Sequence, residues 1–267
     1  MAPSPGARER FRLAWEQKGR QTTAGCDWMR DLTLLVVADR EVDRNIIEET
    51  TAALKAELRL LGARRFRVDT APLPAGSALA GCRKGEIVAS VCIGTAIASL
   101  RSTESRFSGS AIYYLTPAAL DQLPRDLGNG SSVGPPAGEA SFRDGWMVQS
   151  LYYHFRNRRQ DPTLAAFGGW KFARHSLAHT ARHELGHFLG LPHHENLPNP
   201  GFPEAGLCTQ CTHRGAGSHG VAHAECLMFC GAGDDEWFHQ ETFGSGFGFC
   251  PKCRAAAAAY LKGLESR

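Results

Sequence analysis

The chain has 267 residues, of which 43% are hydrophobic and 21% are charged, and its formal net charge is +3. This composition is typical of a globular protein with one large domain or two small ones, and it argues against a membrane protein. The net charge is too small to indicate nucleic-acid binding, and residues 1–17 lack the apolar segment of a secretory signal. We therefore expect a cytoplasmic protein that binds neither nucleic acid nor membranes.

The first part of the chain predicts an α/β fold. Residues 32–38 form a continuous apolar run, typical of a strand that is buried on both faces, and residues 43–62 carry an apolar stripe at helical spacing. Residues 66–70 alternate between apolar and polar side chains and predict a second strand. A β-α-β unit with two parallel strands therefore follows a lead-in over residues 1–30.

The middle of the chain has a less uniform pattern. Residues 87–100 suit either a strand or a short buried helix, whereas residues 110–116 and 146–153 predict strands. Glycine and proline predict a loop over residues 127–138. Residues 171–189 predict a long helix, because the apolar pattern ends at a glycine and a proline.

The composition changes at about residue 194. From there to residue 249, glycine, proline and polar residues dominate, and a terminal helix is expected over residues 255–264. We divide the chain into a sheet-containing part, residues 31–193, and a cysteine-rich part, residues 194–267. The expected fold class is α/β, with a twisted, mixed, mostly parallel sheet, two long helices and a small irregular C-terminal zinc-binding subdomain.

The helix over residues 171–189 carries the strongest chemical signal, the sequence HELGHFLGLPH that starts at His183. His183 and His187 are four residues apart, so both imidazoles lie on one helix face and can share a metal ion. Gly190 permits the left-handed conformation that ends a helix, and the chain can then bring His193 back as a third ligand. Three neutral imidazoles leave one coordination position open, which is typical of catalytic zinc.

Glu184 adjoins the first of these ligands and is the candidate general base, because its carboxylate can reach a water on the metal. His175 and His179 continue the histidine spacing backward along the helix, too far along its axis to bind the same ion. We expect them to pack or to support the ligands. His194 is a rival for the third position, but the spacing from the glycine turn favours His193.

The cysteines gather in the last quarter of the chain. Six of the nine lie there at short paired spacings: Cys208, Cys211, Cys226, Cys230, Cys250 and Cys253. An odd total without a signal peptide argues against a disulfide framework, and such spacings favour metal binding. The remaining three, Cys26, Cys82 and Cys92, are isolated in the sequence.

These motifs resemble those of the archaemetzincins, a family of zinc metallopeptidases in the metzincin clan. The resemblance rests on HELGHFLGLPH, on Cys226-Leu227-Met228 and on Cys250-Pro251-Lys252-Cys253. It implies a metzincin-like fold and two zinc ions, one catalytic on three histidines and one structural on four cysteines. By the same resemblance, Met228 is the Met-turn methionine beneath the catalytic zinc, and Cys226, Cys250 and Cys253 are three structural ligands.

The chain departs from the family pattern after the third histidine, where the family has a cysteine and this chain has His194. An insert of 32 residues separates His193 from Cys226, and it carries Cys208 and Cys211. Three arrangements stay open. One insert cysteine completes the structural site, or the two insert cysteines pair with the C-terminal Cys-x-x-Cys, or all six late cysteines hold two ions.

The motif favours a zinc-dependent metallopeptidase that hydrolyses peptide bonds in a peptide or protein substrate, an aminopeptidase being one form of it. The alternative is a zinc-stabilised binding or regulatory module with a vestigial three-histidine site. The intact Glu184 argues against that alternative, because a site that only holds a metal ion needs no general base beside its ligands. A nucleic-acid-binding zinc ribbon is disfavoured, because acidic residues 234–236 lie near few basic ones.

Overall fold

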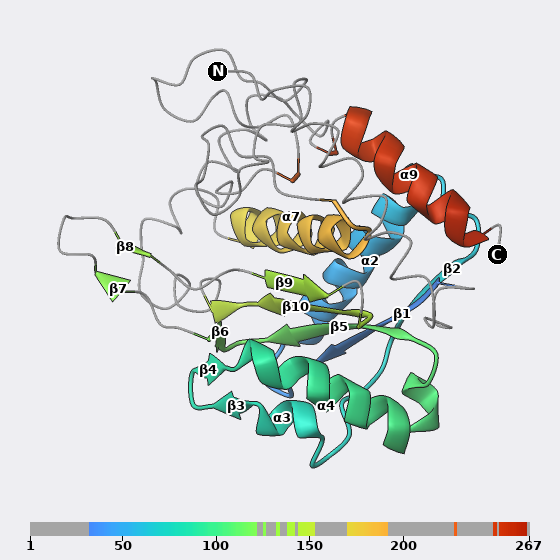
Figure 1. The fold of residues 1–267 in the computed structure, drawn as a ribbon. Helices are drawn as coiled ribbons and strands as arrows, with labels where there is room; N and C mark the ends of the chain where they lie inside the picture. The colour runs from blue at the N-terminus through green and yellow to red at the C-terminus, as the bar shows by residue number, and fades with distance from the viewer. Residues whose placement is uncertain are drawn as a thin grey trace, which may run out of the picture.

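The centre of the fold is a five-stranded sheet in the order β2-β1-β5-β10-β9 (Figure 1). The computed structural model describes residues 32–121, 125–126, 132–133, 138–141, 144–152, 170–191, 227–228, 248–249 and 251–265. The sheet consists of β1 (Leu32–Ala38), β2 (Phe66–Thr70), β5 (Ala111–Thr116), β10 (Trp146–Ser150) and β9 (Gly138–Ser141). β1 is parallel to β2 and β5, and β5 is parallel to β10, whereas β9 runs antiparallel to β10. The expected mixed, mostly parallel α/β sheet is confirmed.

Helices cover both faces of this sheet (Figure 1). One face carries α2 (Arg44–Leu60), α7 (Trp170–Phe188) and α9 (Pro251–Glu265). The other face carries α3 (Ala78–Gly81), α4 (Ser90–Thr103) and the short 3-10 helix η2 (Ser105–Phe107). Two small sheets flank the main one, and they consist of β3 (Arg83–Lys84), β4 (Ile87–Val88) and β6 (Ala119–Leu120), and of β7 (Arg125–Asp126) and β8 (Ser132–Val133).

Alternation along the strands divides the core into two layers, because successive side chains of a strand point to opposite faces. In β1, Leu34 and Val36 pack under α2 and α7, while Leu35 and Val37 pack against α4. In β5, Tyr113 lies in the first layer and Tyr114 in the second. A sheet buried on both faces explains why the sequence of β1 is continuously apolar.

The structure confirms most predicted elements and shifts some of their bounds. The ambiguous segment 87–100 divides into the short strand β4 and the helix α4. The strand expected over 146–153 ends at Ser150, and the terminal helix begins earlier than expected, at Pro251. The loop expected over 127–138 contains β8.

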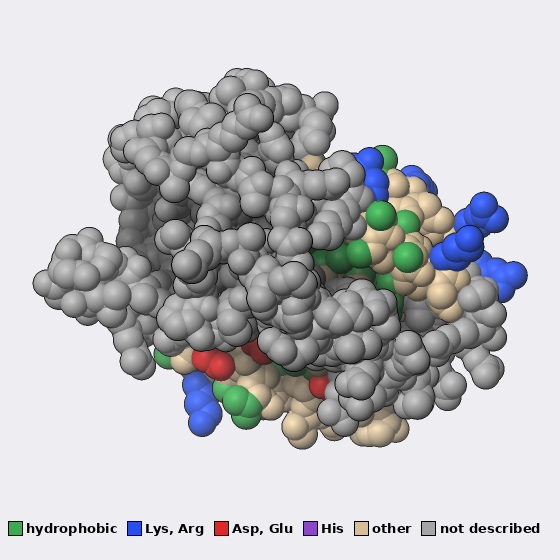
Figure 2. Space-filling model, turned by 45° about the horizontal axis from the view of Figure 1, so that its top comes forward, with side chains coloured by type: hydrophobic (Ala, Val, Ile, Leu, Met, Phe, Trp, Pro, Cys, Tyr) green, Lys and Arg blue, Asp and Glu red, His purple; other side chains and the backbone are tan. Residues whose placement is uncertain are grey.

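The C-terminal helix α9 packs on the same core as α2 and α7. Cys253, Ala257 and Leu261 are four residues apart and are buried, so they form the apolar side of this helix. Arg254 and Lys262 are exposed. Figure 2 shows basic and hydrophobic side chains next to each other at the right of the view, the side on which Figure 1 shows α9.

The lead-in and most of residues 194–267 lie outside the described residues, so the domain division stays a prediction.

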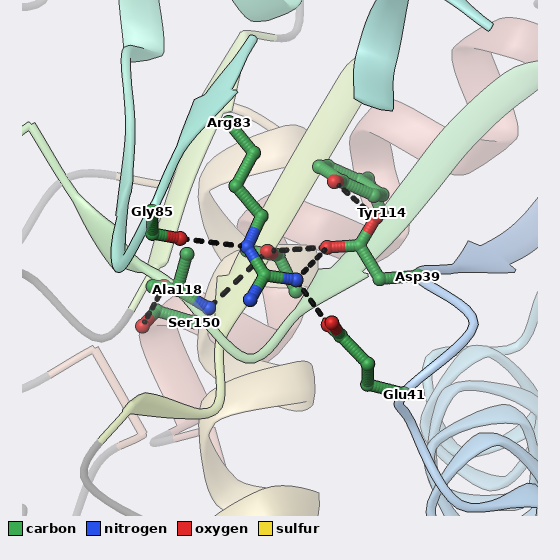
Figure 3. A network of polar contacts seen from close by, with 8 residues as sticks. Asp39, Glu41, Arg83, Gly85, Tyr114, Ala118 and Ser150 are labelled. Atoms are coloured by element: carbon green, nitrogen blue, oxygen red, sulfur yellow. Dashed lines mark hydrogen bonds and ion pairs between the residues drawn. The ribbon is translucent and has the colours of Figure 1, made fainter. Parts of the chain in front are cut away.

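A polar network closes the carboxyl ends of β1 and β5 (Figure 3). The buried carboxylate of Asp39 accepts hydrogen bonds from Tyr114 Oη at 2.7 Å and from Thr116 Oγ1 at 2.8 Å. Arg83 lies 3.6 Å from the same carboxylate and also pairs with Glu41. Burial and the carboxylate of Asp39 both raise the pKa of Tyr114, so its hydroxyl keeps the proton it donates. The network fixes the β3–β4 hairpin to the end of the sheet.

A disulfide joins Cys82 and Cys92, two cysteines that are isolated in the sequence and for which the sequence predicts no pairing. Their separation in sequence is 10 residues, but the β3–β4 hairpin turns the chain back between them. The N–H of Ala89 donates to Cys82 O at 3.3 Å, and the Cα atoms of the two cysteines are 5.5 Å apart. Spacing alone does not indicate this pairing, because the turn depends on the fold.

No helix among the described residues is long and apolar enough to cross a bilayer.

We expect reduction of the Cys82–Cys92 disulfide to lower the free energy of unfolding by about 2–3 kcal/mol, the loop-closure value for a loop of this length. Urea unfolding of the wild type with and without dithiothreitol measures the change. The variant with serine at both positions should show the lower stability with and without dithiothreitol. Any difference between its two unfolding curves reports an effect of the reductant on other parts of the protein. An unchanged unfolding midpoint in the reduced wild type would contradict the prediction.

Candidate metal centre

Helix α7 places the motif because its apolar stripe faces the sheet. Its buried core residues are Leu177, Ala181, Leu185 and Phe188, spaced by three or four positions. The two motif histidines therefore lie on the flank of the helix. The ring centroids of His183 and His187 are 4.7 Å apart, and the two planes are at 85°. The predicted juxtaposition of these two imidazoles on one helix face is confirmed.

Backbone carbonyls set the orientation of both rings. His183 Nδ1 contacts Leu227 O, and His187 Nδ1 lies 2.8 Å from Leu191 O. A carbonyl oxygen only accepts hydrogen bonds, so each Nδ1 carries the proton and each Nε2 carries the lone pair. Burial lowers the pKa of His187, which favours its neutral form. In this tautomer, a neutral imidazole presents the Nε2 lone pair through which histidine binds zinc.

The helix ends where the sequence predicts. Gly190 has a φ of 84°, and the N–H of Leu191 donates to Gly186 O at 2.8 Å, which closes the last turn of the helix. This turn also places Leu191 O against the His187 ring. His193, the predicted third ligand, lies two residues further on and outside the described residues.

Glu184 lies in a closed environment between α7 and the edge strand β9. The residue is 3% exposed, and its side chain occupies the space that a Cβ at Gly138 would need. Its Oε2 is buried and has no hydrogen-bond partner among the described residues. Burial, and secondarily the nearby Glu139, raise the pKa of Glu184 to about 8. With this pKa, the Glu184 side chain is a stronger base than an exposed glutamate and can exchange a proton near neutral pH.

Met228 packs directly against α7 at Gly186, which lies between the two histidines in the sequence. It is fully buried, and a Cβ at Gly186 would collide with Met228 Sδ. The same Cβ would lie 2.9 Å from Phe249 Cε1. Gly186 is therefore the residue that lets this methionine and phenylalanine approach the helix backbone.

Of the predicted cysteine ligands, the described residues include Cys253, which is buried near the start of α9. Four predicted ligands lie outside the described residues: Cys208, Cys211, Cys226 and Cys250. Within the described ranges, no group of three or more histidine, cysteine, aspartate or glutamate residues lies together in a way that could hold a metal ion. The structural zinc site stays a prediction.

The structure also shows polar groups around the site that the sequence pattern does not indicate. Tyr113 Oη donates to Gln149 Oε1 at 2.7 Å, and Gln149 Nε2 donates to Leu177 O at 3.2 Å. This buried pair connects β5 and β10 to α7. Burial raises the pKa of Tyr113, and the negative charge of Glu184 raises it further. His179, which the sequence predicts to pack or to support the ligands, is buried, and its ring centroid is 6.2 Å from that of His183.

No known family model matches the chain, and no curated protein matches it. The structure is similar to a crystal structure of archaemetzincin from Methanopyrus kandleri, with a TM-score of 0.46 and 17% sequence identity over 87% of this chain and 97% of that chain. It is also similar to metalloproteinase-II from Bacteroides fragilis, with a TM-score of 0.46 and 11% identity over 89% of this chain and 55% of that chain. Both similarities are weak, so a functional assignment rests on the residues of this chain.

Proposed function

We propose that the chain is a zinc-dependent metallopeptidase. The observation that carries the proposal is the arrangement on α7: two adjacent imidazoles with the lone pair on Nε2, next to the buried carboxylate of Glu184. His183, His187 and His193 are the proposed ligands of the catalytic zinc. A zinc ion there supplies a Lewis acid that polarises the scissile carbonyl and lowers the pKa of water.

Glu184 is the proposed general base. Its Oε2 accepts a proton from the attacking water and then delivers that proton to the nitrogen of the leaving amine. The burial of Glu184 against Gly138 keeps bulk water away from its carboxylate, which raises the basicity of that group. A vestigial metal site needs no buried carboxylate at this position, so the binding-module alternative leaves the burial of Glu184 unexplained.

Strand β9 is the proposed substrate platform. It pairs with β10 along one edge and lies beside α7 at Gly138. A peptide in extended conformation can add to the other edge of such a strand and bring its scissile bond beside Glu184. The substrate is therefore proposed to be an extended peptide or an unfolded protein segment.

The resemblance of the late motifs supports two further roles. Met228, packed under the motif at Gly186, is the proposed Met-turn residue. Cys226, Cys250 and Cys253 are proposed to hold a structural zinc with Cys208 or Cys211 as the fourth ligand. The protein is then expected to contain two zinc ions, one catalytic and one structural.

Removal of the metal tests this proposal. We expect a chelator to abolish hydrolysis of a quenched fluorescent peptide and added zinc to restore it, with about two zinc ions per purified chain by elemental analysis. His187→Ala should lose one ion and all hydrolysis. Wild-type protein that binds zinc at the histidines but cleaves no peptide would favour the binding module. A single ion, lost on replacing the histidines, would contradict the cysteine site.

A further inference from the structure

A partly buried ion pair connects α2 to the residue that precedes the first proposed ligand. Glu57 on α2 is fully buried, and Arg182 Nε on α7 donates to its Oε2 at 2.6 Å. The other oxygen, Oε1, is buried and has no hydrogen-bond partner among the described residues. A carboxylate in this environment depends strongly on the guanidinium that faces it, because burial of an uncompensated charge is costly.

The same guanidinium extends to the backbone at Gly248. A Cβ at that residue would lie 3.5 Å from Arg182 Nη2 and 3.5 Å from Arg254 Nη2, so two guanidinium groups approach one point of the chain. The carboxylate of Glu57 holds the first of them in place by its hydrogen bond. The ion pair therefore holds the Arg182 guanidinium close to the backbone at Gly248.

Gly248 is in turn linked to the proposed metal ligand. Leu227 N–H donates to Gly248 O at 3.1 Å, and Leu227 O accepts the hydrogen bond from His183 Nδ1. The contacts therefore form a closed path that leaves α7 at Arg182 and returns to α7 at His183. The carbonyl in this path is the group that fixes the tautomer of the imidazole.

We propose that Glu57 and Arg182 are positioning residues for His183: they hold the backbone at Gly248 and thereby the Leu227 carbonyl that directs Nε2 toward the metal. This inference rests on the proposed function, since it assumes that His183 binds zinc. Hydrogen-bond partners of ligating histidines typically change metal affinity by about 10–100-fold when they are disturbed. A pair that only joined α2 to α7 would change stability without changing the affinity of the folded protein.

The test compares variants of the pair in the full chain by two measurements. The zinc dissociation constant comes from competition with a chromophoric chelator, and the ¹⁵N shifts of the His183 ring in the metal-free protein report its tautomer. We expect Glu57→Gln and Arg182→Met each to weaken zinc binding at the histidines about tenfold and to populate the second tautomer. The double variant should be no weaker than either single variant, because the two residues act through one path. Arg182→Lys keeps the charge and should give an intermediate affinity.

Ile46→Ala is the matched control. Ile46 is fully buried on the same helix, 11 residues before Glu57, so its loss destabilises α2 about 16 Å from the ion pair. Its zinc affinity and His183 tautomer should equal those of the wild type. If the variants of the pair behave like Ile46→Ala, the ion pair is structural only and the inference is wrong. If the wild type binds no zinc at the histidines, the proposed function fails, and the tautomer measurement still decides whether the pair positions His183.

Discussion

Replacing Glu184 by glutamine is expected to leave zinc bound and to lower the rate of peptide hydrolysis by about 10²–10⁴-fold, the usual contribution of a positioned general base. Glutamine has nearly the same shape and retains the buried environment between α7 and Gly138. It cannot accept the proton of the attacking water. Zinc content by elemental analysis and kcat/KM on a fluorescent peptide measure the two effects separately.

The stability of the metal-free Glu184→Gln variant shows whether lost hydrolysis comes from the missing general base or from a damaged fold. The pKa of Glu184 is about 8 in the folded protein and 4.5 in the unfolded chain. The unfolded state therefore releases this proton at lower pH, and the folded wild type loses stability as the pH rises from about 4.5 to about 8. Glutamine does not titrate, so the metal-free variant should be the more stable protein at pH 8, by a few kcal/mol at most.

Glu139→Gln is the matched control for this substitution. Glu139 lies on β9 next to Gly138, is exposed, and contributes to the raised pKa of Glu184 by its charge. The control removes a neighbouring carboxylate without removing the base, so kcat should stay near that of the wild type, and any effect on substrate binding at β9 should appear in KM. Unchanged turnover in the Glu184 variant would remove the general-base role. Loss of bound zinc in that variant would show that the residue has another role in the site.

Elements with a strong pattern of their own could be predicted from the sequence. The continuous apolar run of β1 and the helical stripe of α2 each carry enough hydrophobic residues to determine their own structure. The spacing of His183 and His187 also defines a geometry on any helix, so their juxtaposition needs no tertiary information. Gly190 ends the helix because few other residues adopt its backbone conformation easily.

Features that depend on distant parts of the chain could not be predicted. Strand β9 is short and rich in small residues, so it has no strong sequence pattern of its own. Its pairing with β10 is what makes it a strand. The disulfide depends on the β3–β4 turn, and the Leu227 carbonyl reaches His183 across 44 positions of sequence. The ion pair of Glu57 and Arg182 spans 125 positions. Such contacts have no local signal, because only the folded chain brings the two partners together.

Alanine at Gly186 and alanine at Gly263 are expected to have opposite effects on stability, although both glycines lie in helices. A helix interior generally prefers alanine over glycine by about 0.5–1 kcal/mol. At Gly263 on α9, nothing lies within 4 Å of the added Cβ, so the substitution should stabilise the protein by up to that amount. At Gly186, the added Cβ would collide with Met228 Sδ and crowd Phe249, and both are buried.

The collision at Gly186 should outweigh the gain in helix propensity, because overpacking a buried contact typically costs about 1–3 kcal/mol. It should also weaken zinc binding, since displacing Met228 moves the adjacent Leu227 carbonyl away from His183. Chemical denaturation and zinc competition measure the two effects. Met228→Ala in the Gly186→Ala background makes room for the methyl group and should recover part of the stability, so the two substitutions should be less than additive. Equal stability of the Gly186 and Gly263 variants would contradict the packing of Met228 against the motif helix and, with it, the support that this methionine gives to the proposed metal site.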